Sequence, residues 1–256
     1  MGKQMVALVA RKPSLELAGV IDTSPDQVGK DVSEILGLKD LSGVTVSGSA
    51  EELFRSVQAD VVLHAITSFA RVAWPQIEHA VRNGCDVITI AEEMAYVAAQ
   101  HPALAEEIDA LARTCGVTIL GTGVNPGYVL DTLVVSLTAV CSDVRRITAT
   151  GMNDLAPFGP TVLQTQGVGT TVEEFERGLA DGSIVGHVGF PESLSMIAKR
   201  LGWQLDEIRQ YRESIVARAR RTTPHVVVEP GRVAGCRHTA KGLVGGQVVV
   251  ELIHPQ

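Results

Sequence analysis

The sequence lacks most features that would assign it to a class at once. Aromatic side chains make up only 4% of its 256 residues, and its four cysteines form neither a C-x-x-C pair nor a metal-finger spacing. Such widely spaced cysteines favour reduced thiols in a cytoplasm over disulfides or structural zinc. No apolar stretch approaches a membrane span of roughly 20 residues. The apolar run near the amino end is broken at Arg11, too early for a secretory signal. We therefore expect a cytoplasmic protein with no membrane partner.

Positive charge is also scarce. The chain has 22 basic and 29 acidic residues, for a net charge of -7, and no run of Lys or Arg forms a stripe that could follow phosphates. Nucleic acid is therefore not an expected partner. No cluster of His and Cys has ligand spacing, so we expect no catalytic metal. What the chain does have is 45% apolar residues, enough to bury the core of one large domain or two smaller ones.

The first half alternates strand and helix patterns, which is typical of an α/β parallel sheet covered on both faces. Helices are predicted at 1–11, 75–83 and 102–115, and strands at 15–22 (LELAGVID), 59–65, 86–91 and 117–120. A doubly wound nucleotide-binding sheet needs a strand before its first helix, and this chain starts inside that helix. The pattern predicts a Rossmann-type doubly wound parallel sheet with its first strand missing, serving as a dinucleotide-binding domain over residues 1–125.

The pattern changes beyond Pro126. Helices are predicted at 128–139 and 191–201, a strand at 146–151, and a hairpin turn at Gly245-Gly246. Either Thr170 with Glu173 or Thr171 with Glu174 forms a capping box ahead of a further helix. These signals predict a second, α+β domain over residues 126–256 with a mostly antiparallel sheet.

Asp22 stands at the end of an expected strand, where an acidic side chain can accept hydrogen bonds from both hydroxyls of an adenosine ribose. This position favours NAD, although an aspartate after a strand is also a common turn residue. Of the Gly-rich turn that binds a pyrophosphate, only Met1-Gly2 is present, in the place of the last glycine. The pyrophosphate site therefore cannot form completely from the sequence as written.

Two loops are candidates for contact with a nicotinamide. Ala65, Thr67 and Ser68 follow a buried strand at the edge where ligands of such sheets bind, and their small side chains let a cofactor approach the backbone. The alternative is a plain connection in which Thr67 or Ser68 caps the next helix. In GTGVNPGYVLDTL, Asn125 can offer its amide to a carboxamide or a substrate, or the segment is simply an interdomain hinge.

Glu92 and Glu93 form an adjacent pair of carboxylates at the end of an apolar strand, in TIAEEMAY. In extended backbone they would point to opposite faces, so only one would face the cleft. Burial beside a cofactor raises the proton affinity of a carboxylate, which lets it transfer protons near neutral pH or hold an ammonium ion. A solvated pair that opens a loop is the alternative. We favour Glu92 as the catalytic residue, with Glu93 in reserve.

Candidate substrate contacts lie in the second half. NDLAPFGPT and TQGVGTT form long loops with an ordered Gly and Pro pattern, and such loops are often functional. Among the residues of these loops and the seven histidines, the candidates are Asn153, Thr170, His187 and His238. A lone histidine is also often purely structural.

Taken together, LELAGVID, VVLHAITSF, TIAEEMAY, GTGVNPGYVLDTL, QTQGVGTT and VAGCRHTAKG resemble the 2,4-diaminopentanoate dehydrogenases and native amine dehydrogenases, relatives of dihydrodipicolinate reductase. The resemblance implies reversible oxidative deamination with NAD or NADP and a homodimer. It also implies a glutamate that binds ammonia or the amine, carried onto Glu92, and a ribose-binding acid, carried onto Asp22. Members of the family extend beyond this sequence on both sides, so both domains are expected to be incomplete at the ends of the chain.

The sequence thus predicts an NAD(P)-dependent oxidoreductase that interconverts a small amine or amino acid, such as 2,4-diaminopentanoate, with its ketone and ammonia. One alternative keeps the fold and makes the substrate a cyclic imine, as in dihydrodipicolinate reductases. A second alternative is a non-catalytic remnant that has lost its pyrophosphate-binding turn.

Overall fold

The computed structural model describes all 256 residues, which divide into two compact units. Unit 1 comprises Met1–Val97 and His101–Thr122, and unit 2 comprises Ala98–Gln100 and Gly123–Gln256. The nucleotide-binding role of residues 1–125 and the substrate and dimerisation role of residues 126–256 stay predictions. None of the helices combines the length and the apolar character that crossing a bilayer demands.

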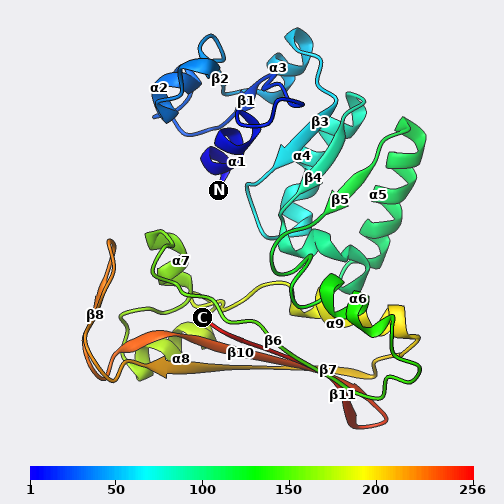
Figure 1. Cartoon of the computed structure of the whole chain (residues 1–256), viewed down its shortest axis with the longest axis vertical. Helices are drawn as coiled ribbons and strands as arrows, with labels where there is room; N and C mark the ends of the chain where they lie inside the picture. Colours follow the sequence, from blue (N-terminus) through cyan, green and yellow to red (C-terminus); the bar gives the residue numbers. More distant parts are fainter. The chain divides into compact units, whose positions relative to one another are not determined.

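The strands of unit 1 are all parallel and form two separate sheets (Figure 1). The first pairs β1 (Val20–Ile21) with β2 (Val46–Ser47), and the second has the order β3–β4–β5. The strands of the second sheet are β3 (Val61–His64), β4 (Asp86–Thr89) and β5 (Ile119–Gly121). In a doubly wound sheet the first strand lies between the strands that correspond to β1 and β3, and no strand occupies that place here. The predicted fold class is confirmed.

The helices of unit 1 cover these strands. They are α1 (Gly2–Val9), α2 (Val32–Leu36), η1 (Lys39–Leu41), α3 (Ala50–Ser56), α4 (Ala70–Arg82), η2 (Glu92–Ala95), η3 (Val97–Ala99, which ends in unit 2) and α5 (Pro102–Cys115), where η marks a 3₁₀ helix. α4 and α5 pack with β3–β5 around a core that includes Ile77, Val81, Val87 and Ile108. Because the apolar residues of α5 recur at helical spacing and Gly116 ends the helix in a left-handed conformation, its predicted bounds are confirmed.

Two predicted elements of unit 1 are wrong in extent. LELAGVID is not a buried strand, because only Val20–Ile21 pair with β2 and Leu15 is 49% exposed. β1 has a partner on one side only, so little of this segment is covered. The helix predicted to begin at Pro75 begins at Ala70. Burial of the first turn of α4, at Ala70, Ala73 and Trp74, outweighs the cost of about 3 kcal/mol for a proline inside a helix.

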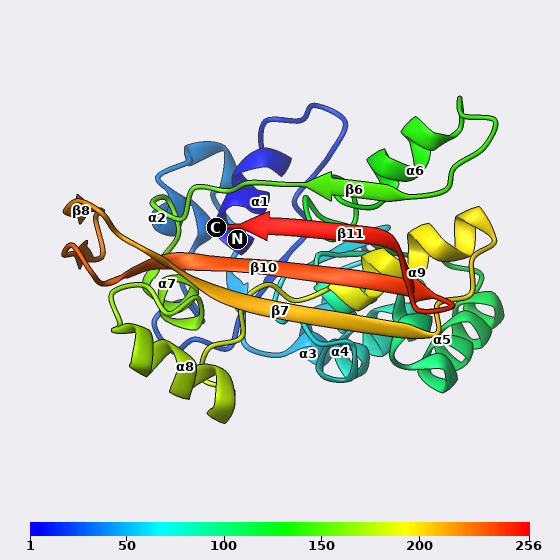
Figure 2. The ribbon, with the colours of Figure 1, turned by 90° about the horizontal axis from the view of Figure 1, so that it is seen from below.

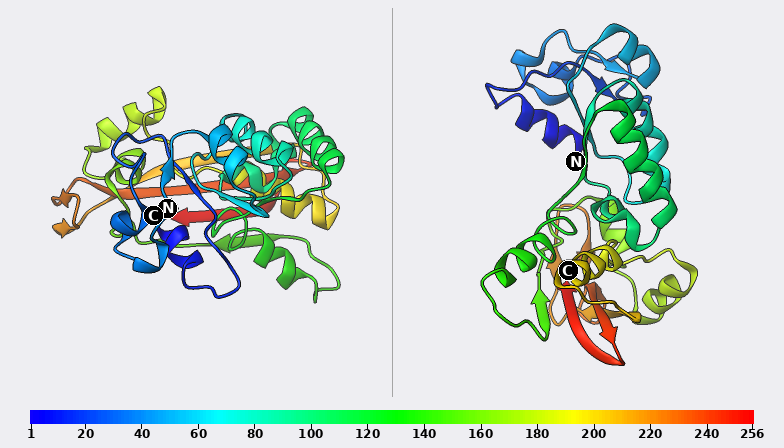
Figure 3. Two further views of the ribbon diagram at one scale, coloured as in Figure 1. Left: turned by 90° about the horizontal axis from the view of Figure 1, so that it is seen from above. Right: turned by 90° about the vertical axis from the view of Figure 1, so that its right-hand side faces the viewer.

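Unit 2 is built on a mixed, mostly antiparallel sheet with the order β6–β11–β10–β7 (Figure 2). Its strands are β6 (Ile147–Thr150), β7 (Glu207–Val216), β10 (Val233–Val244) and β11 (Gln247–Pro255). Only the β6–β11 pair is parallel. Gly245 and Gly246 turn the β10–β11 hairpin with φ values of 58° and 75°, so the predicted hairpin and its glycines are confirmed. A short arm, β8 (Arg221–Thr222) paired with β9 (Val227–Val228), extends from one end of the sheet (Figure 3).

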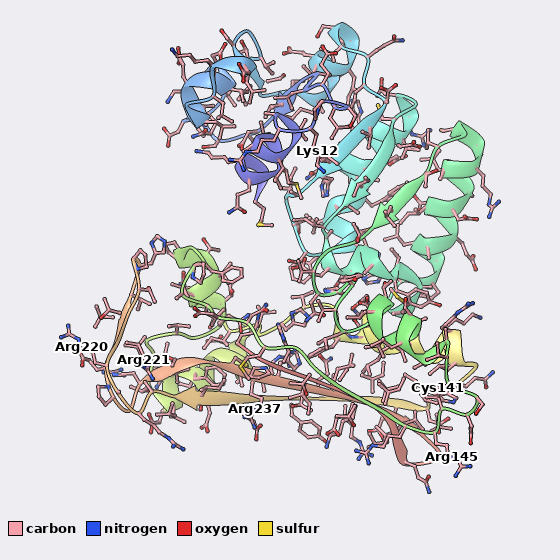
Figure 4. The ribbon with its side chains drawn as sticks, in the orientation of Figure 1. Lys12, Cys141, Arg145, Arg220, Arg221 and Arg237 are labelled. Carbon is pink, nitrogen blue, oxygen red and sulfur yellow. The ribbon has the colours of Figure 1, made fainter.

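The helices of unit 2 cover one face of this sheet. They are α6 (Thr132–Thr138), α7 (Pro160–Thr165), α8 (Val172–Asp181) and α9 (Phe190–Leu201). α9 packs through Leu194 and Ile197 against Ala240, Val250 and Leu252 of the hairpin. The other face carries exposed side chains, among them Arg237, which is labelled in Figure 4. The capping box of α8 is formed by Thr171 and Glu174, the second of the two pairs predicted.

Candidate active site

The backbone after β4 folds into a tight turn and is not extended. Glu92 opens the 3₁₀ helix η2, so the prediction that Glu92 and Glu93 point to opposite faces of a strand is wrong. The turn lies directly over Gly121 on β5, where an added Cβ would come within 1.9 Å of the carbonyl oxygen of Met94. Only glycine allows this approach, so Gly121 at the end of β5 shapes the turn that follows the neighbouring strand β4.

Glu93 is engaged in structural contacts. The residue is buried, with 9% of its surface exposed, and its carboxylate accepts a hydrogen bond of 2.8 Å from the backbone N–H of Ala70, the first residue of α4. The same oxygen lies 3.4 Å from Nε2 of His101. Phe69, which precedes α4, has no side chain that can accept a hydrogen bond from the free N–H groups at the start of the helix. Glu93, which is distant in the sequence, supplies that acceptor.

This arrangement corrects one expectation for the loop before α4. Neither Thr67 nor Ser68 caps the helix; the hydroxyl of Thr67 accepts the N–H of Phe69, 3.3 Å away. The carbonyl of Ser68 accepts the backbone N–H of Glu93 at 3.1 Å, which ties the loop after β3 to the turn after β4.

Glu92 is half-buried and remains available for chemistry. Burial raises the pKa of its carboxyl group, and the neighbouring charge of Glu93 acts in the same direction, whereas a hydrogen bond with the Ser68 side chain opposes the rise. A carboxyl group with a raised pKa can both hold and release a proton close to neutral pH. Glu92 therefore combines accessibility with a raised proton affinity.

The remaining candidates of unit 1 lie at the ends of strands. Ala65, Thr67 and Ser68 form the partly exposed connection between β3 and α4, so their backbone is accessible. Asp22 is exposed after β1, and its carboxylate accepts the N–H of Ser24 at 2.7 Å, as in the predicted turn. Gly2 begins α1, and the space beside its Cα is clear.

Asn125 is the most unusual polar residue at the start of unit 2. Both the oxygen and the nitrogen of its amide are buried and have no hydrogen-bond partner. The segment that carries Asn125 is held by Asp131, which is fully buried and accepts the N–H of Gly127 at 2.7 Å and the hydroxyl of Ser193 at 2.8 Å. Buried amides without partners are rare in folded proteins, so this one is a strong candidate for a ligand contact.

Unit 2 brings together three buried histidines, His187, His238 and His254, here called the histidine cluster. The ring of His187 lies 4.8 Å from that of His254 and 6.5 Å from that of His238. The ring of Phe190 packs 4.8 Å from His187 and 4.7 Å from His238. His238 and His254 stand directly opposite each other on β10 and β11 and share the face that α9 covers.

Hydrogen bonds fix the neutral tautomers of two of these rings. The N–H of His187 donates to Nδ1 of His238 at 3.2 Å, so the neutral His238 ring carries its hydrogen on Nε2. Nδ1 of His254 lies 2.6 Å from the carbonyl oxygen of Gly151, so this ring carries its hydrogen on Nδ1 and leaves a lone pair on Nε2. The Nε2 atoms of all three rings are buried without a partner. The cluster thus holds an unused donor on His238 and an unused acceptor on His254.

Burial keeps the histidine cluster neutral. It lowers the pKa of His238 to about 3, together with the positive charge of Arg212, and it lowers the pKa of His254. It also lowers the pKa of His187 well below the usual value, and the two other rings add to this effect. No group of His, Cys, Asp or Glu side chains in the chain is arranged to hold a metal ion. Neutral imidazole rings can each donate one hydrogen bond and accept another.

The other predicted substrate residues have different surroundings. The N–H of Asn153 donates to the carbonyl of Pro255 at 3.2 Å, which places Asn153 beside the end of β11 next to His254. Thr170 uses its hydroxyl within its own loop, donating to the carbonyl of Gly167 at 2.6 Å. His254 was not predicted; the available signal was its alternation with Leu252 and Val250 on the buried face of β11.

Two family models match the chain. Residues 128–256 match the 2,4-diaminopentanoate dehydrogenase C-terminal domain, and residues 1–89 match the N-terminus of dihydrodipicolinate reductase.

Individual proteins agree with these matches. The chain is 41% identical to the 2,4-diaminopentanoate dehydrogenase of Acetoanaerobium sticklandii, over 100% of the chain and 73% of that protein. It is 26% identical to the amine dehydrogenase of Streptomyces virginiae, over 99% of the chain and 73% of that protein. Among solved structures, the amine dehydrogenase from Mycobacterium smegmatis has a TM-score of 0.86 and 25% identity, over 100% of the chain and 75% of that structure.

Proposed function

The chain belongs to the family of 2,4-diaminopentanoate dehydrogenases and amine dehydrogenases, and we propose that it interconverts a small amine with its ketone and ammonia, using a nicotinamide cofactor. The observation that carries the proposal is the half-buried Glu92, whose pKa is raised by burial at the carboxyl end of a parallel sheet. Ligands of such sheets bind at that edge. Glu92 is the proposed catalytic residue, and Glu93 supports it from η2 by holding the start of α4.

The match of unit 2 favours an amine over a cyclic imine as the substrate. The likeness to dihydrodipicolinate reductase is confined to residues 1–89, within unit 1. Residues 128–256, which carry the histidine cluster, match the 2,4-diaminopentanoate dehydrogenase domain. Because substrate choice depends on the substrate-binding half, we place the chain with the amine dehydrogenases.

Glu92 would act as both base and acid in the reductive direction. Its carboxylate accepts a hydrogen bond from ammonium and takes one proton, which frees ammonia to add to the ketone carbon. The protonated Glu92 then delivers a proton to the hydroxyl of the carbinolamine, which leaves as water and yields an iminium ion. When bound, the cofactor supplies the hydride that reduces this iminium carbon. In the oxidative direction the same proton transfers run in reverse.

The residues present fit a dinucleotide at several points. In unit 1, Ala65, Thr67 and Ser68 leave the backbone after β3 open to a nicotinamide ribose. Asn125, in unit 2, stays a candidate by itself, because its amide has an unused donor and acceptor for a polar ligand. Gly2 leaves the start of α1 clear for a phosphate. Asp22 would hold the adenosine ribose, and its negative charge would disfavour a 2′-phosphate, so we propose NAD over NADP.

The histidine cluster would bind a second polar group of the substrate. Its unpartnered donor on His238 and acceptor on His254 suit a polar group of the substrate. Asn153 lies next to the end of β11 that carries His254, and Thr170 joins it in the proposed substrate site. A substrate such as 2,4-diaminopentanoate, which carries more than one polar group, fits this chemistry better than a simple alkylamine.

An activity assay tests the role of Glu92. NAD(P)H oxidation is measured with a panel of small ketones plus ammonium, and with cyclic imines, for the wild-type chain, Glu92→Gln and Glu93→Gln. We expect Glu92→Gln to lower kcat by on the order of a hundredfold or more, because the proton transfers are lost. Glu93→Gln keeps an acceptor for the N–H of Ala70 and should retain most activity. Full activity in Glu92→Gln would refute the assignment, and turnover of imines alone would favour the reductase.

NADH titration tests whether the chain binds the cofactor, as an enzyme must, or is a non-catalytic remnant. Binding of NADH to the wild-type chain, followed by nicotinamide fluorescence, is expected and would be weakened by Asp22→Ala. Absence of binding at millimolar NADH would favour the remnant.

We also propose that two copies associate in the cytoplasm through the sheet face of unit 2 that no helix covers. Lys241 and Glu251 form an ion pair of 3.2 Å on this face, and a surface carrying both signs of charge can complement itself across a two-fold axis. The four cysteines are free, in keeping with a reducing compartment. Sedimentation of the wild-type chain and of Lys241→Glu tests the dimer, which the charge reversal should weaken.

A further inference from the structure

His64 and Thr89 end two neighbouring strands of unit 1 and pair with each other in register. Both side chains are buried, with 5% of His64 and none of Thr89 exposed. They lie at the carboxyl edge of the sheet, where the turn that carries Glu92 begins. Neither has a part in the chemistry proposed above, yet a histidine at this buried place is costly unless its polar atoms are satisfied.

The hydrogen bonds of these residues form a series in which each group donates to the next, from Ala91 toward Gln76. Nε2 of His64 lies 3.1 Å from the side-chain oxygen of Gln76, which only accepts, so Nε2 carries the hydrogen. Nδ1 then has a lone pair, and it accepts the hydroxyl of Thr89 at 2.9 Å. The oxygen of that hydroxyl accepts the backbone N–H of Ala91 at 3.1 Å. Every donor and acceptor along this path is used once, and the path ends one residue before Glu92.

Backbone bonds hold the turn at several points. The carbonyl of Thr89 accepts the N–H of Thr122 at 2.9 Å, and the carbonyl of Ala91 accepts the N–H of Met94 at 2.9 Å. The carbonyl of His64 accepts the N–H of Ile90 at 3.1 Å, and the carbonyl of Ser68 accepts the N–H of Glu93 at 3.1 Å. Between these two points, the N–H of Ala91 is held by the Thr89 hydroxyl alone. The Thr89 hydroxyl is thus one of the contacts that set the direction in which the chain leaves β4, one residue before Glu92.

We propose that His64 and Thr89 are positioning residues for Glu92, holding the turn at Ala91 so that the Glu92 carboxyl group stays half-buried beside Ser68. This inference rests on the catalytic role of Glu92 proposed above. This series of hydrogen bonds requires the neutral form of His64. If Nδ1 carried a proton, it would donate to the Thr89 hydroxyl as Ala91 does, and the hydrogen of that hydroxyl would have no acceptor. Burial lowers the pKa of His64 and keeps the ring neutral, although Gln76 opposes this shift.

The decisive experiment follows the titration of Glu92 itself. Glutamate side chains are labelled with ¹³C at the carboxyl carbon, and the Glu92 signal is identified by its absence in Glu92→Gln. Thr89→Val keeps the shape of the side chain and removes the hydroxyl, so the turn should loosen and the pKa of Glu92 should fall by about half a unit or more. Thr89→Ser restores the hydroxyl and should restore the wild-type titration. Thr114→Val, which removes an exposed hydroxyl from α5, is the matched control and should leave the titration unchanged.

Kinetics provide the second readout. Loss of the Thr89 hydroxyl should lower kcat on the order of tenfold, with little change in KM for the ketone, because the acid is misplaced while substrate binding persists. If Thr89→Val does not fold, Gln76→Leu carries the test. Gln76 is exposed on α4, and its replacement removes the acceptor of the His64 Nε2–H. It should shift the Glu92 titration in the same direction.

The outcomes separate this inference from the proposed function. An unchanged Glu92 titration in Thr89→Val, or in Gln76→Leu where that variant replaces it, overturns the positioning role. A titration that shifts in Thr89→Val and returns in Thr89→Ser establishes the positioning role, even if no variant and no wild-type protein oxidises NAD(P)H with ketones. In that last case the proposed amine chemistry fails and the structural coupling remains.

Discussion

Replacing His238 by asparagine should reduce the loss in the free energy of unfolding of unit 2 as the pH falls. In the folded chain, burial and the charge of Arg212 lower the pKa of His238 from 6.5 to about 3. Above pH 6.5 the ring is neutral in both the folded and the unfolded chain, so its stabilising effect is complete. Between pH 6.5 and 3 only the unfolded chain binds the proton, and the free energy of unfolding falls by about 1.4 kcal/mol per pH unit. At pH 5 the loss from this ring amounts to about 2 kcal/mol.

Urea unfolding at several pH values between 7.5 and 5 measures this slope. The chain has two tryptophans, and in a Trp74→Phe background the fluorescence of Trp203 reports on the core of unit 2 alone. In His238→Asn the side-chain oxygen can still accept the N–H of His187, but nothing at this position titrates. We expect this variant to lose about 2 kcal/mol less than the parent between pH 7.5 and pH 5.

His225→Asn is the matched control, because it removes an exposed imidazole from the β8–β9 arm. Its pH profile should overlay that of the parent. Equal slopes for the parent and His238→Asn would contradict the reasoning, since they would mean that the buried ring takes up its proton without unfolding. A slope that changes equally in both variants would show that the effect does not come from burial.

Three smaller changes test the local structure. Gly121→Ala places a methyl group 1.9 Å from a backbone carbonyl and should lower the free energy of unfolding, measured by thermal unfolding, by about 3 kcal/mol or more. Gly159→Ala is the control and should lower it little, because the space around Gly159 is free. Thr171→Ala removes the capping box of α8 and should lower the free energy of unfolding by about 1 kcal/mol, while Thr171→Ser should not. Ser193→Ala removes a donor to the buried Asp131 and should cost about 2 kcal/mol in urea unfolding.

Elements with strong local signals were predictable from the sequence. The bounds of α5 follow from apolar spacing and the glycine that ends the helix, and the turn of the β10–β11 hairpin follows from its two glycines. The capping box could be narrowed to two pairs, because the pattern of Thr and Glu repeats one residue apart. In each case the information lies within a few residues of the element itself.

Features that depend on distant partners were not predictable. The turn at Glu92 requires the glycine on β5, and the start of α4 requires Glu93 from the other side of the loop. His254 joins the histidine cluster only because the hairpin register places it opposite His238. The strand expected at LELAGVID shrinks to Val20–Ile21 because it has one neighbour, a fact about the sheet as a whole.

The two adjacent glutamates show how one fold assigns different tasks to identical side chains. The start of α4 holds the carboxylate of Glu93 through a backbone N–H, and a negative charge there complements the helix dipole. Burial raises the pKa of Glu92, and the charge of Glu93 adds a smaller part in the same direction. Glu93 therefore supports the proposed chemistry without touching a substrate, mainly by anchoring the helix. Exchanging the two tasks would require a different turn from the present one, which depends on the close approach that Gly121 allows.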